Sequence, residues 1–131
     1  MVIRGSCNCK AVQFTLETPP KMMGTCHCSP CRKSGANIFV FVQNRDLSWV
    51  SGKEAIGRYG PYENNKYTRC FCKICGTGLG EILSDSESLP INAHCLDDDL
   101  QIQNSFHEFV DDKPSWINIC DDAKQFPKHP P

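Results

Sequence analysis

The stretch Cys26-His27-Cys28-Ser29-Pro30-Cys31 holds three of the ten cysteines of this chain. Thiols this close in sequence are poorly placed to pair with one another, because a disulfide needs Cα atoms roughly 4.4–6.8 Å apart and a set dihedral angle. All three can instead face one soft metal ion, since zinc binds thiolates in a tetrahedral arrangement. Three protein ligands leave one coordination position open, which is typical of catalytic zinc sites, whereas a structural site would take a fourth cysteine from elsewhere.

A short helix is predicted within and just after this stretch. Ser29 is a favoured N-cap, Pro30 suits the first helical position and Gly35 is a typical C-terminal stop, so the helix should run from residue 30 to residue 34. Cys31 then lies in the first turn. Unpaired backbone N–H groups and the two basic residues that follow favour its thiolate form over the thiol.

Length and composition indicate one domain, residues 1–131. A net charge of −1, from 14 basic and 15 acidic residues, argues against a nucleic-acid groove. The N-terminus has no apolar signal-peptide core, and the longest apolar run, residues 38–42, is too short to span a bilayer. Ten cysteines without an export signal indicate metal binding or reactive thiols, so we expect a cytoplasmic protein with no membrane partner and leave its oligomeric state open.

Short apolar segments separated by glycine and proline turns make up the rest of the chain. No stretch longer than about ten residues keeps a 3.6-residue apolar period, so the sequence predicts a mainly β fold of short strands. The proline-rich tail, residues 126–131, is expected to be irregular. The expected strands are residues 12–17, 37–43, 47–50, 56–62, 78–83, 89–94 and 106–110.

A second pattern, Cys72-x2-Cys75 followed by Gly76, has the form of a zinc knuckle, in which the glycine lets the backbone turn under the metal. Such a knuckle needs two more thiolates from a distant part of the chain. Cys7 and Cys9 supply a pair that has no other obvious use. We therefore predict a closed structural zinc site from these four cysteines and favour it over disulfides or an iron–sulfur cluster. The three-cysteine stretch is left without a partner pair, which favours a second, open zinc site.

Three cysteines remain. Cys70 precedes Cys72 by two residues; if it points to the same face of the strand as Cys72, it could compete for either metal, and it could complete the second site and close it. Cys95 and Cys120 stand in apolar surroundings and are expected to be small core residues, although either could also close that site. The ring of His27 is expected to point away from its neighbouring ligands, and His107 is expected to be an ordinary strand histidine.

Four motifs occur in order along the chain: Gly5-Ser6-Cys7-Asn8-Cys9, the stretch from Cys26 to Gly35, Phe71-Cys72-Lys73-Ile74-Cys75-Gly76-Thr77, and His107-Glu108-Phe109-Val110 with Trp116 beyond it. In these motifs the chain resembles the glutathione-dependent formaldehyde-activating enzyme family, which also includes centromere protein V. The resemblance implies an Mss4-like distorted β-sandwich with a four-cysteine and a three-cysteine zinc site at the positions assigned above. Lys10 stands where a glycine is usual, which should affect only a turn, and Cys70 replaces what is commonly an aromatic or polar residue.

The activity that the resemblance implies is synthesis of S-(hydroxymethyl)glutathione from glutathione and formaldehyde, a carbon–sulfur lyase reaction written in the joining direction. Zinc with three thiolates carries a net charge of −1, so it polarises water weakly but suits an incoming thiol. The candidate catalytic residues are therefore Cys26, Cys28 and Cys31. Arg32 and Lys33 are candidates to hold a glutathione carboxylate, although exposed helix charges are more often solvated.

Two alternatives stay open at this point. The first is a non-catalytic zinc module, either a glutathione carrier or an Mss4-like interaction domain, because formaldehyde combines with thiols unaided and leaves an enzyme only a modest barrier to lower. The second is a methionine sulfoxide reductase on the same fold, but that would need two separated Cys-x2-Cys pairs, and the Cys-x-Cys openings here count against it. The cysteine pattern does not specify the thiol or the aldehyde.

Overall fold

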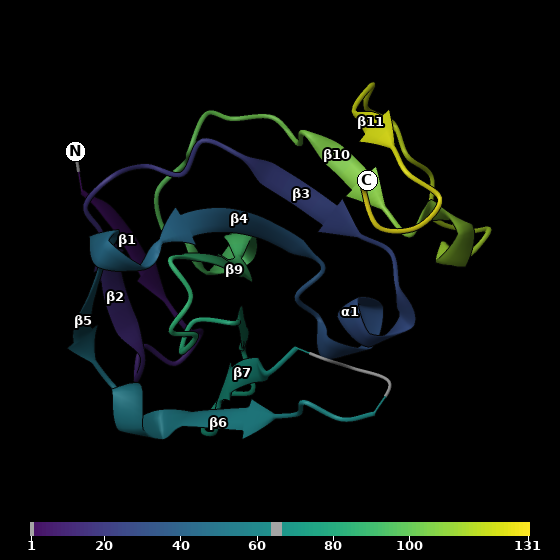
Figure 1. Ribbon diagram of the computed structural model, residues 1–131. Coiled ribbons are helices and arrows are strands. Elements are labelled where there is room, and N and C mark those ends of the chain that lie inside the picture. The colour runs from purple at the N-terminus through teal and green to yellow at the C-terminus, as the bar shows by residue number, and fades with distance from the viewer. Residues whose placement is uncertain (1, 64–66) are drawn as a thin grey trace.

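The computed structural model describes residues 2–63 and 67–131. Within them the chain forms eleven strands, one short α-helix and four 3-10 helices, which confirms the mainly β prediction (Figure 1). None of the described helices is long and apolar enough to cross a membrane. The elements are β1 (Ile3–Ser6), β2 (Gln13–Leu16), β3 (Met23–Cys26), α1 (Ser29–Ser34), β4 (Ile38–Gln43), η1 (Asn44–Asp46), β5 (Leu47–Ser51), η2 (Lys53–Ala55), β6 (Ile56–Tyr59), β7 (Arg69–Cys72), β8 (Gly78–Gly80), β9 (Ser88–Asn92), η3 (Ala93–Cys95), β10 (Phe106–Glu108), η4 (Val110–Asp112) and β11 (Lys124–Gln125).

The strands form two sheets. The smaller sheet has the order β1-β2-β5, and the larger has the order β11-β10-β3-β4-β9-β8-β7-β6. Strand β10 runs parallel to both of its neighbours, β3 and β11, whereas the remaining neighbours pair antiparallel. In Figure 1 the larger sheet curves from β11 at the upper right to β6 at the lower edge, and the smaller sheet stands at its left.

The core lies between these sheets and follows from the alternation of each strand. β2 buries Phe14 and Leu16, and β4 buries Val40 and Val42, because successive side chains of a strand point to opposite faces. Burial of each such side chain contributes about 1.5–3 kcal/mol. The other members of this buried apolar cluster are Ile3, Cys7, Val12, Ile56, Cys70, Cys72, Leu79, Ile82, Leu89, Ile91 and Cys95.

Helix α1 begins one residue earlier than the sequence predicts. Its N-cap residue is Cys28, with no side-chain capping bond, and Pro30 lies in its first turn. The predicted stop is observed, because Gly35 has φ 74° and its N–H donates to the carbonyl of Arg32. A glycine adopts this left-handed conformation without the steric penalty that a Cβ brings.

Several predicted strands end early or are interrupted. The strand that begins at Ile56 stops at Tyr59, and the one predicted over residues 89–94 gives way to a 3-10 helix after Asn92. The chain after Gln125 is irregular, as predicted, yet its backbone is held by the segment after β10. The N–H of Val110, for example, donates to the carbonyl of Phe126 at 3.1 Å.

Gly5 allows strands β1 and β2 of the small sheet to pack around a large ring. It pairs with Phe14 across β1 and β2. A Cβ atom placed on Gly5 would lie 2.2 Å from Cζ of the Phe14 ring, which is itself only 1% exposed. The ring therefore occupies the space that any other residue at position 5 would need.

We expect the substitution Gly5→Ala to lower the free energy of unfolding by about 1–3 kcal/mol, because the added methyl group overpacks the core. Urea denaturation followed by circular dichroism measures this loss. In the double variant Gly5→Ala/Phe14→Leu the smaller side chain makes room, so the two effects should be less than additive. A fully stable Gly5→Ala protein would contradict this account of the packing.

Candidate metal centres and substrate cavity

The first group of cysteines joins two segments that are far apart in the chain. Cys7 follows β1, Cys72 ends β7, and the sulfur atoms of Cys7, Cys9, Cys72 and Cys75 all lie within 4.8 Å of one another. The Sγ–Sγ distance is 3.6 Å between Cys7 and Cys9 and 3.8 Å between Cys9 and Cys72. Zinc–sulfur bonds of about 2.3 Å in a tetrahedron place the sulfur atoms about 3.8 Å apart, so the four thiols fit this ion.

Each cysteine pair lies in a tight turn that is closed by a residue in the left-handed conformation. Lys10 has φ 68° and donates its N–H to the carbonyl of Cys7 at 3.0 Å. Gly76 has φ 80° and donates its N–H to the carbonyl of Cys72 at 2.8 Å. The departure from glycine at position 10 therefore falls in a turn, as expected, and the Lys10 Nζ donates to Ser6 Oγ at 3.0 Å.

Thr77 connects the two turns. Its Oγ1 accepts a hydrogen bond from the backbone N–H of Asn8 at 3.0 Å, and its carbonyl accepts one from the N–H of Cys72 at 3.0 Å. The same hydroxyl lies 3.1 Å from Cys75 Sγ. This contact, followed by backbone hydrogen bonds, lowers the pKa of the Cys75 thiol to about 5, so Cys75 is prepared as a thiolate for a metal.

The second group comes from one continuous stretch of chain. Cys26 ends β3, Cys28 caps α1 and Cys31 lies in its first turn, and their three sulfur atoms also lie within 4.8 Å of one another. Cys26 Sγ and Cys28 Sγ are 3.3 Å apart. The neighbouring thiols of Cys26 and Cys31 lower the pKa of Cys28. Across residues 2–63 and 67–131, no fourth histidine, cysteine or carboxylate joins this group, so its donor set suits a metal ion with one position left for a ligand.

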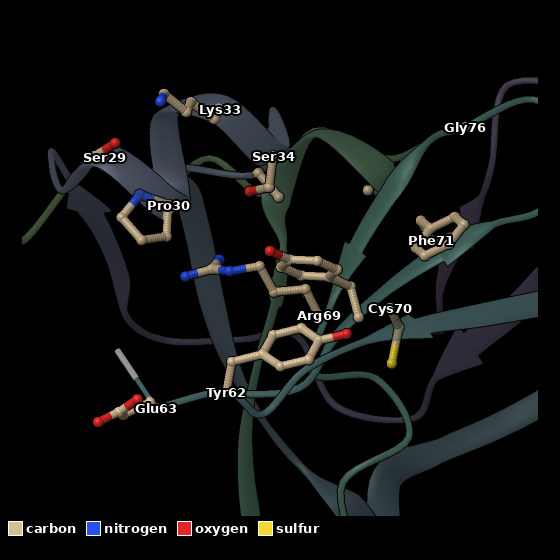
Figure 2. A pocket seen from close by; sticks show the side chains of 14 residues that line it. Ser29, Pro30, Lys33, Ser34, Tyr62, Glu63, Arg69, Cys70, Phe71 and Gly76 are labelled. Carbon is tan, nitrogen blue, oxygen red and sulfur yellow. The ribbon is translucent and has the colours of Figure 1, made fainter. Parts of the chain in front are cut away.

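Arg69 places a positive charge beside this group. Its Nη2 donates to Cys31 Sγ at 3.5 Å, while its buried Nε has no hydrogen-bond partner among the residues that the structure describes. Figure 2 shows the guanidinium group extending from β7 toward Pro30 in α1. The sequence interpretation missed Arg69. The alternation of side chains in β7 could have identified it, because Cys70 and Cys72 point into the core and Arg69 therefore lies on the opposite face.

The three remaining cysteines join neither group. Cys70 is 3% exposed within the core, where burial raises the pKa of its thiol. Cys95 is also a core residue, as predicted, and its Sγ donates to the carbonyl of Gly78 at 3.1 Å. The prediction that Cys120 is a core residue is wrong. It is exposed, because it lies in the irregular segment between β10 and β11.

The ring of His27 contacts another histidine. Its Nε2 lies 2.8 Å from His107 Nδ1, and the two rings stack with their centroids 5.0 Å apart. His107 Nε2 lies 3.0 Å from a carboxylate oxygen of Asp121, which lowers the pKa of Asp121. Since a carboxylate accepts, we assign the His107 proton to Nε2, so His27 donates to His107 Nδ1. This chain of bonds ties the three-cysteine stretch to β10.

The three cysteines line a cavity of about 1080 Å³, and Arg69 and Glu108 line it with them. Ligand pockets usually measure roughly 300–1,000 Å³, so this cavity is large enough for a small-molecule ligand. A second cavity of about 720 Å³ adjoins it and shares Arg69, and Lys33 lines that one (Figure 2). Arg32 lines neither cavity, and its Nε donates to the carbonyl of His27 at 3.2 Å. Substrate binding by Arg32 and Lys33 stays a prediction.

Comparison with known proteins agrees with this geometry. The model of the family described as glutathione-dependent formaldehyde-activating enzyme matches residues 2–112. The chain belongs to this family. A relative from Halomonas elongata, named provisionally as a glutathione-dependent formaldehyde-activating enzyme, is 29% identical over 91% of this chain and 82% of its own length. A Rhodobacter sphaeroides protein of known crystal structure is similar to this family member with a TM-score of 0.60 and 28% identity, over 73% of this chain and 89% of that one.

We expect the purified protein to contain close to two zinc ions per chain, one for each sulfur group. A mild chelator should remove one zinc first, because a site with three protein ligands has room for the chelator to bind as a fourth. Metal analysis during titration with the chelator measures the zinc content per chain and the order in which the two ions are removed. Iron with visible charge-transfer absorption, or a metal-free protein with five disulfides, would contradict the assignment.

We expect Cys72→Ser and Cys7→Ser to unfold the protein. A structural zinc contributes an apparent ~10–16 kcal/mol to folding, as much as the ~5–15 kcal/mol net stability of a whole domain. Cys28→Ser should instead fold and lose only the second zinc, because its group lies within one short segment. Circular dichroism, thermal melting and zinc content distinguish the two classes. Equal damage in all three variants would show that the sites do not differ in this way.

Proposed function

We propose that this family member is a zinc-dependent enzyme that joins glutathione to formaldehyde and forms S-(hydroxymethyl)glutathione. The observation that carries the proposal is the three-cysteine group in the wall of a cavity large enough for the tripeptide. Membership of the family supports the class of reaction. Cys26, Cys28 and Cys31 are the proposed ligands of the catalytic zinc, and Cys7, Cys9, Cys72 and Cys75 those of the structural zinc.

When held by three thiolates, zinc would supply an open position at which a substrate thiol binds as its thiolate. Arg69 offsets part of the negative charge that the three cysteines bring together, since its Nη2 lies 3.5 Å from Cys31 Sγ. Arg69 lines both cavities, and its guanidinium group is suited to a carboxylate of glutathione, as is Lys33 in the adjoining cavity. The charged ends of the tripeptide are therefore held on the α1 side of the site.

Glu108 is suited to handle the proton of the reaction. Its side chain is 11% exposed, lines the cavity and lies 3.0 Å from Nδ1 of His129 through Oε2. When the sulfur attacks the carbonyl carbon, the π electrons of the C=O bond move to oxygen, which then takes a proton. In our proposal the pair formed by Glu108 and His129 supplies this proton and accepts the one released by the thiol.

Exchange NMR tests the proposal, because the uncatalysed addition reaches the same equilibrium and only the exchange rate reports catalysis. In a mixture of formaldehyde, glutathione and their adduct, micromolar enzyme should raise the interconversion rate in proportion to its concentration. Cys28→Ser should abolish the increase and leave the equilibrium unchanged.

Cys120→Ser is the matched control, because this exposed cysteine belongs to neither sulfur group, and it should keep the wild-type rate. A protein that binds glutathione but leaves the exchange at its background rate would be a carrier of the thiol.

A further inference from the structure

An aromatic row crosses the outer face of the larger sheet. The ring centroids of Phe41 and Phe39 are 5.3 Å apart, those of Phe39 and Phe106 are 6.3 Å apart, and those of Phe106 and Phe126 are 6.4 Å apart. In β4 the alternate residues, such as Val40, point into the core, so the phenylalanines lie on the other face and are only half-buried. Such a face of an antiparallel sheet is usually polar and solvated.

Gly24 makes the row continuous. It is the β3 residue that pairs with Phe39 on one side and with Phe106 on the other. A Cβ atom on Gly24 would lie 2.5 Å from Cζ of Phe106, so the ring of Phe106 lies over the glycine and crosses β3 toward Phe39. A larger residue at this position would separate the rings on either side of it.

The aromatic row and the three-cysteine group share one face of the sheet. Cys26 follows Gly24 by two residues in β3, so both residues project to the same side. Glu108 stands in the same relation to Phe106 in β10 and pairs with Cys26. All four phenylalanines line the same cavity as the cysteines. The aromatic row is thus a wall of the proposed reaction site.

The last part of this wall lies beyond the segment that matches the family model, which ends at residue 112. Phe126 is held in place by its backbone, since its N–H donates to the carbonyl of His107 at 2.8 Å and its carbonyl accepts from Val110 at 3.1 Å. His129 and Pro130 also line the cavity, and His129 contacts Glu108. The C-terminal segment of this chain therefore contributes its own side chains to the site.

We infer that the aromatic row binds the apolar substituent of an aldehyde, so that the site also accepts larger aldehydes and prefers one with an aromatic or aliphatic group to formaldehyde. This inference rests on the proposed function and extends it to the choice of aldehyde. Glutathione is charged at its ends and is matched by Arg69 and Lys33. Formaldehyde has only hydrogen atoms on its carbonyl carbon and cannot contact the row. An aldehyde with its carbonyl carbon at the cysteine group would lay its substituent along Phe106 and Phe126.

The chemical step is the same for either aldehyde. The sulfur of the thiol forms a bond to the carbonyl carbon, the π bond of the C=O group breaks, and its electron pair goes to oxygen. The oxygen takes up the proton that the thiol gives up. The product is a hemithioacetal, and no oxidant or reductant takes part.

Exchange NMR with glutathione and three aldehydes tests the inference, with phenylacetaldehyde as the probe and acetaldehyde and formaldehyde as small references. For the wild-type protein we measure the ratio of the enzyme-dependent rate to the background rate with each aldehyde. We expect this ratio to be at least about tenfold higher with phenylacetaldehyde than with acetaldehyde or formaldehyde, because well-formed aromatic contacts stabilise the bound aldehyde. Phe126→Ala should remove most of this advantage, because the phenylacetaldehyde rate should fall much more than the acetaldehyde rate. Trp116→Ala is the control, because Trp116 is 77% exposed and lines neither cavity.

A second variant, Phe41→Thr, removes a ring from the other end of the row with a residue that suits a strand, and it serves if Phe126→Ala does not fold. Equal rates for the three aldehydes, or an equal loss for all three in the variants, would overturn the inference. Light scattering gives a further test. If the wild-type protein is a dimer and Phe126→Ala is a monomer, the aromatic row is a subunit interface and the inference is overturned.

If no aldehyde is accelerated, the proposed function fails, and a binding measurement then decides this inference separately. Titration with 2-phenylethanol, which cannot react with a thiol, should shift the NMR signals of the phenylalanine rings in the wild-type protein and bind at least about tenfold more weakly to Phe126→Ala. Equal binding by the two proteins, or no binding by either, would overturn it.

Discussion

The meeting of two cysteine pairs is the constraint on which the rest of this structure depends. Cys7 and Cys9 follow a strand of the small sheet, and Cys72 and Cys75 lie at the end of a strand of the large sheet, so their convergence fixes one sheet against the other. Cys9 and Cys72 are 63 residues apart in sequence. Closing a loop of that length has an entropic cost, which a metal bound by the four thiolates would offset. The core between the sheets needs this join, because both sheets contribute side chains to it.

The three-cysteine group is under no such constraint. Its ligands lie in one short stretch whose geometry is set locally by the end of β3, the first turn of α1 and the left-handed Gly35. Two distant strands also reach it: Arg69 of β7 lies beside Cys31 Sγ, and Glu108 of β10 pairs with Cys26. In our proposal the fold does not depend on this group for its stability, so the group can keep a coordination position open for a substrate. One group joins two sheets and the other lies within one segment, which is a physical reason to give them different roles.

The features of this structure that depend on neighbours in sequence could be predicted. The strand alternation, the helix stop at Gly35 and the grouping of cysteines by spacing all depend on neighbours in sequence. The aromatic row depends instead on the parallel pairing of β10 with β3, which brings Phe106 over Gly24, and no short-range pattern specifies that register. The same limit explains Cys120, whose apolar neighbours suggested a core position although its segment has no strand to bury it.

Strand pairing over long sequence separations places the aromatic row on the outer face of the large sheet. A half-exposed row of phenylalanines favours aggregation and gains less free energy than a buried core, so a sheet with no ligand on that face would be better served by polar residues. The C-terminal segment does not cover the row. It adds Phe126 to it, with Lys124 stacked on that ring, 5.3 Å from Nζ to the ring centroid. A segment that lengthens an apolar wall beside a thiol site, and leaves the wall open, fits the recognition of an apolar substrate better than it fits the protection of a core.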